Sequence, residues 1–373
     1  KARKGQRIAL IDIADGEVLI QYGSPFGLSK GLKKGDLITR DVLRDIDVDL
    51  ESVSDPSPPQ MPFSPEIYGD MSFQGFVREN GTVGTRNYFL IMPTSLCASE
   101  TAAQIAREAT DKFDIEMKFP NIDGIVAIPT TEGCGCAANV QIERFLGVLS
   151  QYLSHPNVGG ALVIDLGCEQ TNYSALHSYL GRSGLTGNAE YVDWLTIQEE
   201  GGVQKTINQA MEIIRVRLTE VGAMMRVQCP ISKLIVGTEC GASDAFSGIT
   251  ANPLIGAVVD RVISGGGGAI LSEVPEMFGA EHLLMERMRD KNVIDKFRQI
   301  ILWYKKIAES LGVDMRHNLV PENIAGGLIN PCIKSLGAIT KGGTGPIEGV
   351  LEYGEPINSS GLHIMQGPGN DME

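Results

Sequence analysis

Residues 233–256 contain the feature that most limits how this chain can fold. A short apolar run at 234–236, rich in β-branched residues, has the length and composition of a buried parallel strand. Small and polar residues follow at 237–244, and a helical pattern then runs through 262, with Ser243 or Asp244 as its N-cap. Open α/β sheets bind ligands at such turns, although Ser243 and Asp244 can equally serve only as helix caps.

The same arrangement occurs three more times. Apolar runs at 88–92, 124–128 and 161–165 each lead into a polar turn that carries a cysteine. Because the carboxyl ends of parallel strands share an edge, we expect all four turns to lie along one edge of a sheet. The four cysteines are Cys97, Cys134, Cys168 and Cys240. Buried cysteine also occurs as a small apolar residue, but its recurrence at four turns favours a chemical role.

Size and charge narrow the class of protein. A chain of 373 residues is too long for one core and predicts two or three domains. A net charge of −14 argues against a nucleic-acid partner, and no apolar run is long enough to span a membrane. Seven cysteines, without the spacing of a disulfide scaffold or a signal peptide at the start, predict a reducing, cytoplasmic location.

The order of elements predicts an α/β multidomain protein. Residues 1–50, with short β runs at 7–12, 17–22 and 36–39, are expected to form a separately folded module on a flexible Pro/Ser-rich linker at 51–70. A middle α/β domain is expected at 71–228, with a hairpin turn at Asn80-Gly81, and a third domain at 229–373. We also expect helices at 203–220, 280–288 and 293–311, and a loop-like segment at 318–346.

Two further expectations concern glycine and the chain ends. The glycines at 265–268 precede a predicted strand, and those at 342–343 lack the spacing of a P-loop, so we do not expect nucleotide binding. Both ends of the sequence fall inside patterned segments, so we expect further chain before residue 1 and after residue 373.

Several strings in this sequence resemble one family over essentially the whole chain. They are 80–87 (NGTVGTRN), 155–160 (HPNVGG), 166–169 (LGCE), 240–253 (CGASDAFSGITANP) and 279–284 (GAEHLL). They are similar to the altronate/galactarate dehydratase family, and residues 5–37 look like the β-clip (SAF) domain of its fused members. The resemblance implies an iron-dependent sugar-acid hydro-lyase with a β-clip domain, a middle domain and a Rossmann-like C-terminal variant. It leaves the substrate open, and sulfolactate sulfo-lyase is a relative.

Such a hydro-lyase removes the proton next to a carboxylate and expels the β-hydroxyl, which calls for a stabilised enediolate. As ligands for ferrous iron we expect Cys97, Cys134, Cys168 and Cys240. Two alternatives stay open. The first takes oxygen ligands from Glu169, Asp244, Glu273 or Asp371, and the second is a four-cysteine iron–sulfur cluster.

The candidates for acid–base catalysis are Glu169, His282 and Lys341. Arg86 and Asn87 are expected to bind a substrate carboxylate, with Ser243 and Asp244 as further substrate contacts. Structural roles are the alternative for each of them, such as a packed histidine or an ion pair.

Two classes of function remain. One is a metal-dependent hydro-lyase acting as a homodimer on a small-molecule sugar acid, and the other is a sugar-acid-binding protein without turnover. The cysteine-bearing turns favour the hydro-lyase, because a binding module has no need of them.

Overall fold

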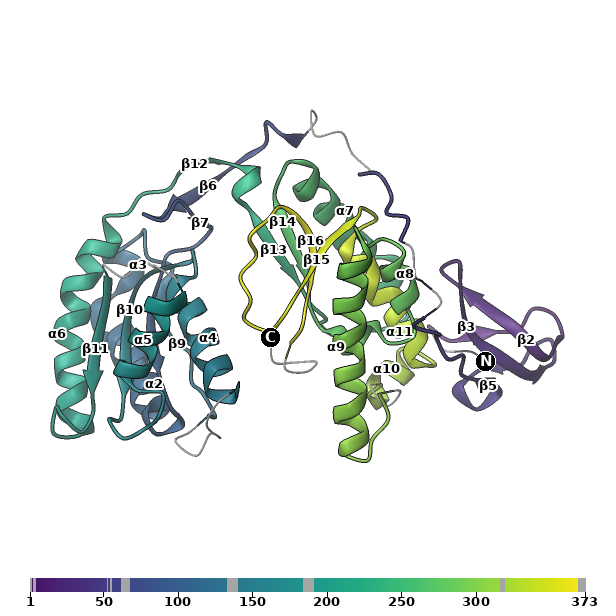
Figure 1. Ribbon diagram of the computed structural model, residues 1–373, viewed down its shortest axis with the longest axis horizontal. Coiled ribbons are helices and arrows are strands. Elements are labelled where there is room, and N and C mark those ends of the chain that lie inside the picture. Colours follow the sequence, from purple (N-terminus) through teal and green to yellow (C-terminus); the bar gives the residue numbers. More distant parts are fainter. Residues whose placement is uncertain are drawn as a thin grey trace. The chain divides into compact units, whose positions relative to one another are not determined.

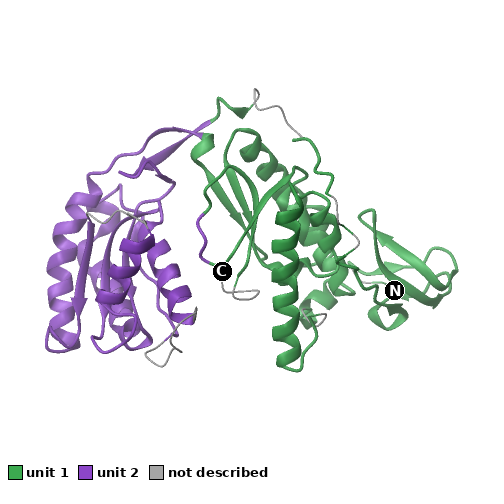
Figure 2. Ribbon diagram, viewed as in Figure 1, with its two compact units in different colours: residues 1–71, 231–353, 357–373 green, residues 72–230, 354–356 purple. Residues whose placement is uncertain are grey.

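The computed structural model describes residues 2, 5–51, 53, 56–61, 68–132, 140–183, 191–315 and 319–367. The chain divides into two compact units (Figure 2). Unit 1 comprises residues 1–71, 231–353 and 357–373, and unit 2 comprises residues 72–230 and 354–356. The boundaries of unit 2 lie close to those expected for the middle domain. The α/β class expected from the sequence is confirmed, since both units contain a parallel sheet with helices.

The core of unit 2 is a four-stranded parallel sheet in the order β9-β8-β10-β11 (Figure 1). Its strands are β8 (Tyr88–Pro93), β9 (Gly124–Ala127), β10 (Val158–Asp165) and β11 (Val192–Thr196). Every residue of β10 is buried, as expected of a central strand with helices on both faces. The chain runs from β8 to β9 on one side and then continues to β10 and β11 on the other. This reversal creates a topological switch point between β8 and β10.

Helices cover both faces of this sheet. Helices α2 (Leu96–Phe113) and α6 (Val203–Gly222) pack on one face, and α4 (Val140–Ser154) and α5 (Tyr173–Ser183) pack on the other. Ile207, Met211, Ile214 and Leu218 of α6 are all buried in the core, which confirms the helical spacing read from the sequence. The remaining elements of unit 2 are the short helix α3 (Ile115–Lys118) and an antiparallel sheet of β6 (Ser72–Val77), β7 (Val83–Gly84) and β12 (Val227–Pro230). The expected hairpin at Asn80-Gly81 connects β6 to β7.

Unit 1 contains a second parallel sheet, in the order β13-β14-β16-β15. Its strands are β13 (Ile235–Thr238), β14 (Gly268–Leu271), β15 (Ile347–Leu351) and β16 (Gly361–Met365). Helix α7 (Ala251–Ser264) packs on β13, β14 and β16, and α9 (Lys291–Ser310) packs on β15. The side chain of Asp290 caps α9 by accepting from the Val293 N–H. The shorter elements are η3 (Ile231–Lys233), η4 (Ser247–Ile249), η5 (Val274–Met277) and α8 (Glu281–Met285).

The helix predicted to start at Ser243 or Asp244 begins later, at Ala251. The Asp244 carboxylate instead accepts hydrogen bonds from the N–H groups of Phe246 and Ser247, both at 2.9 Å. These contacts fix a local turn that leads into the short η4, so the backbone becomes α-helical only after Thr250.

The segment 318–346 was expected to be loop-like, and that prediction is wrong. It contains α10 (Pro321–Ala325), α11 (Pro331–Ala338) and the 3-10 turn η7 (Ile339–Gly342). Both α-helices begin with proline, which suits the first helical position because no N–H is needed there. Asn330 caps α11 by accepting from the Ile333 N–H at 3.0 Å.

The N-terminal residues form β1 (Arg7–Ile8) and β4 (Leu37–Ile38), which pair, and a sheet of β2 (Ile13–Gln21), β3 (Ser24–Leu32) and β5 (Leu43–Arg44), with η1 (Arg40–Val42) between them. Leu19, Phe26 and Leu43 belong to the same buried core as α9 and α11. Asn330 also donates to the Phe26 carbonyl at 2.6 Å. The described N-terminal residues therefore pack into the core of unit 1, whereas the sequence predicted a separately folded module, and part of the predicted flexible linker lies outside the described residues. Within those residues, no helix is long and apolar enough to cross a membrane.

Candidate functional site

The strongest candidate site lies at the carboxyl edge of the unit 1 sheet. Strands β13 and β14 are parallel neighbours, with Thr238 opposite Leu271 at their ends. The residues that follow, Cys240 and Glu273, therefore emerge at the same edge, and the Cys240 N–H donates to Oε2 of Glu273. Ligands bind at this edge in open α/β sheets.

Glu273 has a backbone conformation that glutamate rarely adopts. Its φ of 60° and ψ of 55° lie in the left-handed region. Only three described non-glycine residues, Tyr22, Asp114 and Glu273, have a positive φ, and Glu273 is the one that follows a strand of the parallel sheet in unit 1. Such strain persists only where the surroundings impose it, and it is concentrated at functional sites. The conformation turns the side chain toward Cys240 and Lys341.

Lys341 on η7 forms an ion pair with Glu273, with 3.2 Å between Nζ and Oε2. Both side chains are only 2% exposed. Oε2 takes both hydrogen bonds, and Oε1 has no partner among the residues that the structure describes. Burial raises the pKa of Glu273, with a smaller contribution from Glu276, and this outweighs the lowering by Lys341 and the Cys240 N–H. A buried carboxyl with a raised pKa and a free oxygen can exchange a proton.

Neighbouring groups complete this edge. The Cys240 Sγ lies 3.0 Å from the Ser243 Oγ, and the Ser243 carbonyl accepts from Asn323 of α10 at 2.9 Å. Three residues after Glu273, Glu276 forms a second buried ion pair with Lys334 of α11, at 2.7 Å. Two carboxylates of one short segment are thus each paired with a lysine from α11 and η7.

His282 lies in α8, at the helix start expected from the sequence. Its Nδ1 is buried and has no hydrogen-bond partner within the described residues. Burial lowers the pKa of His282, against the opposing effect of Glu286, so the ring is neutral at neutral pH.

Glu169 lies at the switch point of unit 2 and is buried. Its carboxylate accepts from the hydroxyls of Thr94 and Ser95, both at 3.0 Å, and from the N–H groups of Leu166 and Gly167. Burial alone would raise the pKa of Glu169, but the backbone hydrogen bonds and the Ser95 hydroxyl outweigh it, so the pKa is lowered. The carboxylate therefore ties the loop after β8 to the loop after β10 as a stable anion.

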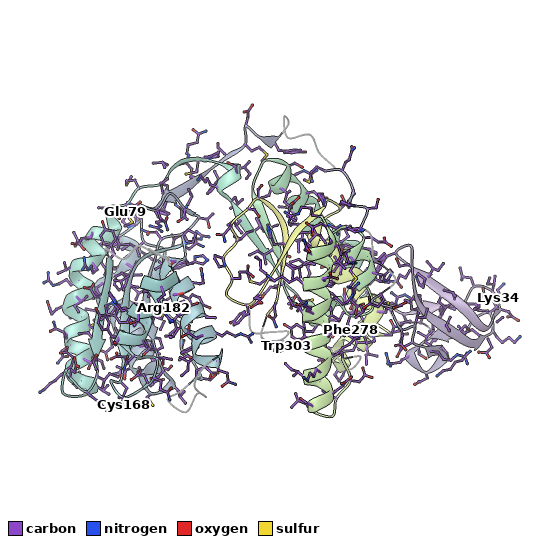
Figure 3. All side chains as sticks on the ribbon, in the orientation of Figure 1. Lys34, Glu79, Cys168, Arg182, Phe278 and Trp303 are labelled. Carbon is purple, nitrogen blue, oxygen red and sulfur yellow. The ribbon has the colours of Figure 1, made fainter. Side chains whose placement is uncertain are left out.

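The four cysteine-bearing turns do not share one edge, and that prediction is wrong. Cys97 follows β8 and Cys168 follows β10 in unit 2, whereas Cys240 follows β13 in the separate sheet of unit 1. Cys97 and Cys168 are exposed, and Cys168 is labelled in Figure 3. Cys134 and Asp371 lie outside the described residues. Within the described ranges, no three His, Cys, Asp or Glu side chains are grouped so that they could hold a metal ion.

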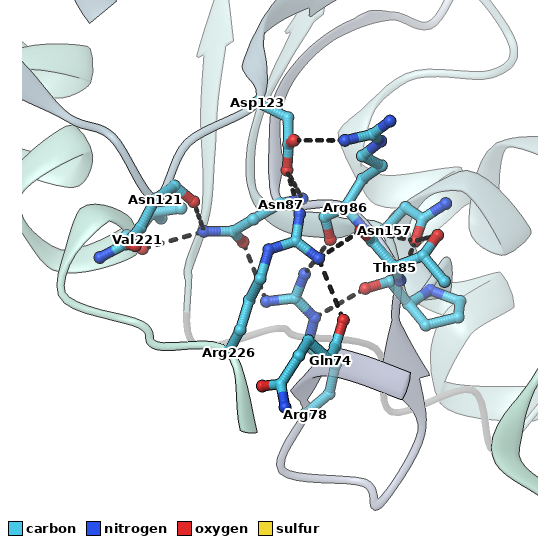
Figure 4. A network of polar contacts seen from close by, with 11 residues as sticks. Gln74, Arg78, Thr85, Arg86, Asn87, Asn121, Asp123, Asn157, Val221 and Arg226 are labelled. Atoms are coloured by element: carbon cyan, nitrogen blue, oxygen red, sulfur yellow. Dashed lines mark hydrogen bonds and ion pairs between the residues drawn. The ribbon is translucent and has the colours of Figure 1, made fainter. Parts of the chain in front are cut away.

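Arg86 and Asn87 precede β8 and so lie at the amino edge of the unit 2 sheet, whereas Glu169 follows β10 at the carboxyl edge. Figure 4 shows the polar network around Arg86 and Asn87. Arg86 pairs with Asp123 at 3.1 Å. The buried Asn87 accepts from Arg78 and donates to the carbonyls of Asn121 and Val221. The structure thus gives both residues internal partners, which corresponds to the structural alternative left open above.

Sequence reasoning named Lys341 but treated its partner Glu273 only as an alternative metal ligand, and it missed Glu276 and Lys334. A signal was available for Glu273, because it follows the strand-like run 269–271 as closely as the cysteines follow theirs. The rule applied to cysteine at strand ends also applies to carboxylates.

Comparison with known proteins gave matches along almost the whole chain. Residues 75–222 match the family model "D-galactarate dehydratase/Altronate hydrolase, second domain", and residues 231–373 match "D-galactarate/Altronate dehydratase, C-terminal". The chain is 34% identical to the altronate dehydratase of Bacillus subtilis over 99% of its own length and 72% of that protein. It is 30% identical to the galactarate dehydratase (L-threo-forming) of Escherichia coli, over 99% of its own length and 71% of that protein. It is 27% identical to the (2R)-sulfolactate sulfo-lyase subunit beta of Chromohalobacter salexigens, over 79% of its own length and 71% of that protein.

Proposed function

The chain belongs to the D-galactarate/altronate dehydratase family, and from that membership we propose that it is a hydro-lyase that removes water from a sugar acid. Three curated relatives that match 99% of the chain, at 30–34% identity, are named as dehydratases. The substrate we propose is an aldonate or aldarate of the altronate or galactarate type. The product would be a 2-keto-3-deoxy acid.

The observation that carries this proposal is the buried Glu273–Lys341 pair at the carboxyl edge of the unit 1 sheet. Dehydration needs a base for the α-proton and an acid for the leaving hydroxyl. A carboxylate and an ammonium in contact supply both. The free Oε1 of Glu273 can accept the proton, and Lys341 can donate one.

In the proposed reaction, the α-carbon–hydrogen bond breaks and its proton moves to Glu273, which leaves an enediolate on the substrate. The β-carbon–oxygen bond then breaks, and the hydroxyl leaves as water after taking a proton from Lys341. Proton transfer from Glu273 to Lys341 across the 3.2 Å contact restores the starting pair. The enol then tautomerises to the 2-keto acid.

The remaining site residues have supporting roles in this proposal. Ser243 and Asp244, which follow Cys240 at the same edge, are proposed substrate contacts. Arg86 and Asn87 are proposed to bind a substrate carboxylate, although both have internal partners in unit 2. Glu169 and His282 remain proposed acid–base groups, secondary to the Glu273–Lys341 pair.

Ferrous iron is the proposed cofactor, and it would supply positive charge to stabilise the enediolate. The sequence suggested Cys97, Cys134, Cys168 and Cys240 as ligands; because Cys97 and Cys168 follow strands of the other sheet, we propose Cys240, at the same edge as the Glu273–Lys341 pair, as the ligand to test. The described part of the chain does not bring a ligand set together, so the proton transfers above are assigned to protein side chains alone.

We also propose the domain types, the cellular location and the assembly of this protein from its family membership. The N-terminal sheets are proposed to be a β-clip (SAF) domain, and residues 229–373 a Rossmann-like variant. We propose that the enzyme acts in the cytoplasm as a homodimer, without nucleic-acid or membrane partners. A net charge of −14 supports the absence of a nucleic-acid partner.

The test is turnover by the purified protein, kept reduced and supplied with ferrous iron, on D-altronate, galactarate and (2R)-sulfolactate. Proton NMR should show a 2-keto-3-deoxy acid from one of the two sugar acids. Release of sulfite from sulfolactate alone would instead identify a sulfo-lyase. Binding of a sugar acid without any product would identify a binding protein.

A further inference from the structure

The loop at 342–345 follows Lys341 directly, and its backbone is fixed by its surroundings. Gly343 has a φ of 65° and a ψ of −156°, which few residues other than glycine adopt. A Cβ atom at this position would lie 2.2 Å from Oδ1 of Asp260. Glycine is therefore required by both the backbone conformation and the contact with Asp260.

Asp260 of α7 is 4% exposed, and its carboxylate holds this loop. It accepts from the Thr344 N–H at 3.0 Å, from the Thr344 hydroxyl at 2.9 Å and from the Gly345 N–H at 3.2 Å. Hydrogen bonds to a buried ionised group are stronger than those between neutral groups. Asp260 consequently fixes the loop on the carboxyl side of Lys341.

Arg287 fixes the same loop through its carbonyl groups. Its guanidinium donates to the Gly342 carbonyl at 3.0 Å and to the Gly345 carbonyl at 2.9 and 2.7 Å. Burial lowers the pKa of Arg287 to about 10, which leaves the group charged at neutral pH.

Helix α7 also supports the residue before Lys341. A Cβ atom on Gly256 would lie 2.1 Å from the Thr340 carbonyl oxygen, so this helix approaches η7 at backbone distance. Lys341 is thus constrained on both sides in sequence, by contacts with α7 at Thr340 and with Asp260 and Arg287 at 342–345.

We propose that Asp260 and Arg287 are positioning residues that hold Lys341 against Glu273, an inference that rests on the proposed function. A lysine side chain has a flexible four-carbon stem, so the position of its Nζ atom is well defined only if the backbone that carries it is fixed. A displacement of about 1 Å at a catalytic group can cost roughly 100-fold in rate.

The test compares Asp260→Asn, Arg287→Lys, Lys341→Met and the double variant Asp260→Asn/Lys341→Met. The control is Arg298→Lys. Arg298 of α9 is a 14% exposed arginine that donates to the carbonyl groups of Leu50 and Val53, and within the described residues it makes no hydrogen bond or ion pair with the 342–345 loop. Circular dichroism and melting temperature verify that each variant is folded.

We expect Asp260→Asn and Arg287→Lys to lower kcat by about 10- to 100-fold while KM changes little, because the chemical step and not binding depends on the position of Lys341. Asp260→Asn should cause no further loss in the Lys341→Met background. The Arg298→Lys control should keep its kcat. An additive loss in the double variant, or parental kcat in both single variants, would overturn the proposal.

A second readout does not depend on turnover. Acylation of Lys341 by an amine-reactive reagent, followed by peptide mass spectrometry, should be faster in Asp260→Asn and Arg287→Lys than in the parent or in Arg298→Lys. Unchanged labelling would overturn the positioning role whatever the activity. If Lys341→Met keeps parental turnover, the assigned chemistry fails, and the labelling still reports whether these residues hold Lys341.

Discussion

Lys341 Nζ lies 3.2 Å from Oε2 of Glu273, and the two side chains come from segments separated by 68 residues. A buried ion pair is weak evidence of a stabilising role, because desolvation of both charges offsets their attraction. The left-handed backbone of Glu273 adds a further cost. Both the buried ion pair and the strained backbone reduce the stability of the fold. Because they occur at the edge of the sheet where ligands bind, a catalytic role explains them better than a stabilising one.

The first prediction is that Glu273→Gln abolishes most turnover while the protein stays folded. Glutamine keeps the size of the side chain and an oxygen that can accept from Cys240 and Lys341, but it cannot take a proton. We expect kcat to fall by about 100-fold or more, the scale of general acid–base catalysis. Steady-state kinetics on the sugar acid that the protein dehydrates measures this.

Glu276→Gln is the matched control for that prediction. Glu276 is a buried glutamate three residues further along, and it pairs with a different lysine, Lys334. It should lower the melting temperature but retain far more activity than Glu273→Gln. Equal losses of activity in both variants would indicate that the segment matters as a structural unit and that Glu273 has no special role.

The second prediction concerns the pH dependence of stability. Burial raises the pKa of Glu281, against weaker effects of hydrogen bonds and of Lys305. As pH rises, the unfolded chain releases this proton first, so ionisation favours unfolding. The contribution of Glu281 is therefore fully present below its unfolded pKa, about 4.3, and is lost as pH rises through its folded pKa.

Glu281→Gln should remove the part of the loss of stability at rising pH that comes from ionisation of Glu281. Chemical denaturation of parent and variant between about pH 4, just below the unfolded pKa, and about pH 8 should show the variant gaining stability relative to the parent as pH increases. Glu309→Gln, at an exposed position of α9, is the control. A constant difference between Glu281→Gln and the parent across the range would contradict the prediction.

The parts of the fold that the sequence predicted are those in which burial imposes a long, regular pattern. Helix α6 was recognised because its apolar residues repeat with the period of a helix, and strand β8 because it is a continuous apolar run of the length of a buried strand. Helices α10 and α11 were missed because they are short and are started by Pro321, Pro331 and the Asn330 cap, features that also mark loops.

Strand pairing was not readable from local sequence. The runs before Cys97 and Cys240 look alike, yet they belong to different sheets, because pairing depends on residues far apart in the chain. The same reason explains the incomplete site prediction. Lys341 was named as an acid–base candidate, but its pairing with Glu273 becomes apparent only when η7 packs beside the end of β14.

The third prediction is a requirement for ferrous iron. Chelator treatment of the reduced protein should abolish turnover, and added ferrous iron should restore it. Cys240→Ser should lower the iron content measured by atomic absorption, because a hydroxyl is a poorer ligand than a thiolate for iron. Full activity in a metal-free sample would exclude the proposed cofactor, and unchanged iron in Cys240→Ser would exclude this ligand.

The fourth prediction concerns Asp244, whose Oδ1 accepts from Phe246 and from both the N–H and the hydroxyl of Ser247. Asp244→Asn can keep these contacts through its amide oxygen, so this variant removes the charge and leaves the turn intact. We expect stability to fall by at most about 1 kcal/mol, the scale of a cap. If Asp244 contacts the substrate, kcat/KM should fall by about 10-fold or more, as expected for a lost hydrogen bond to a charged group. Asp244→Ala is the comparison, since it loses both the charge and the turn contacts and should also lower the melting temperature. A folded Asp244→Asn with parental kcat/KM would assign Asp244 to the turn alone and leave the Glu273–Lys341 pair as the chemical centre of this edge.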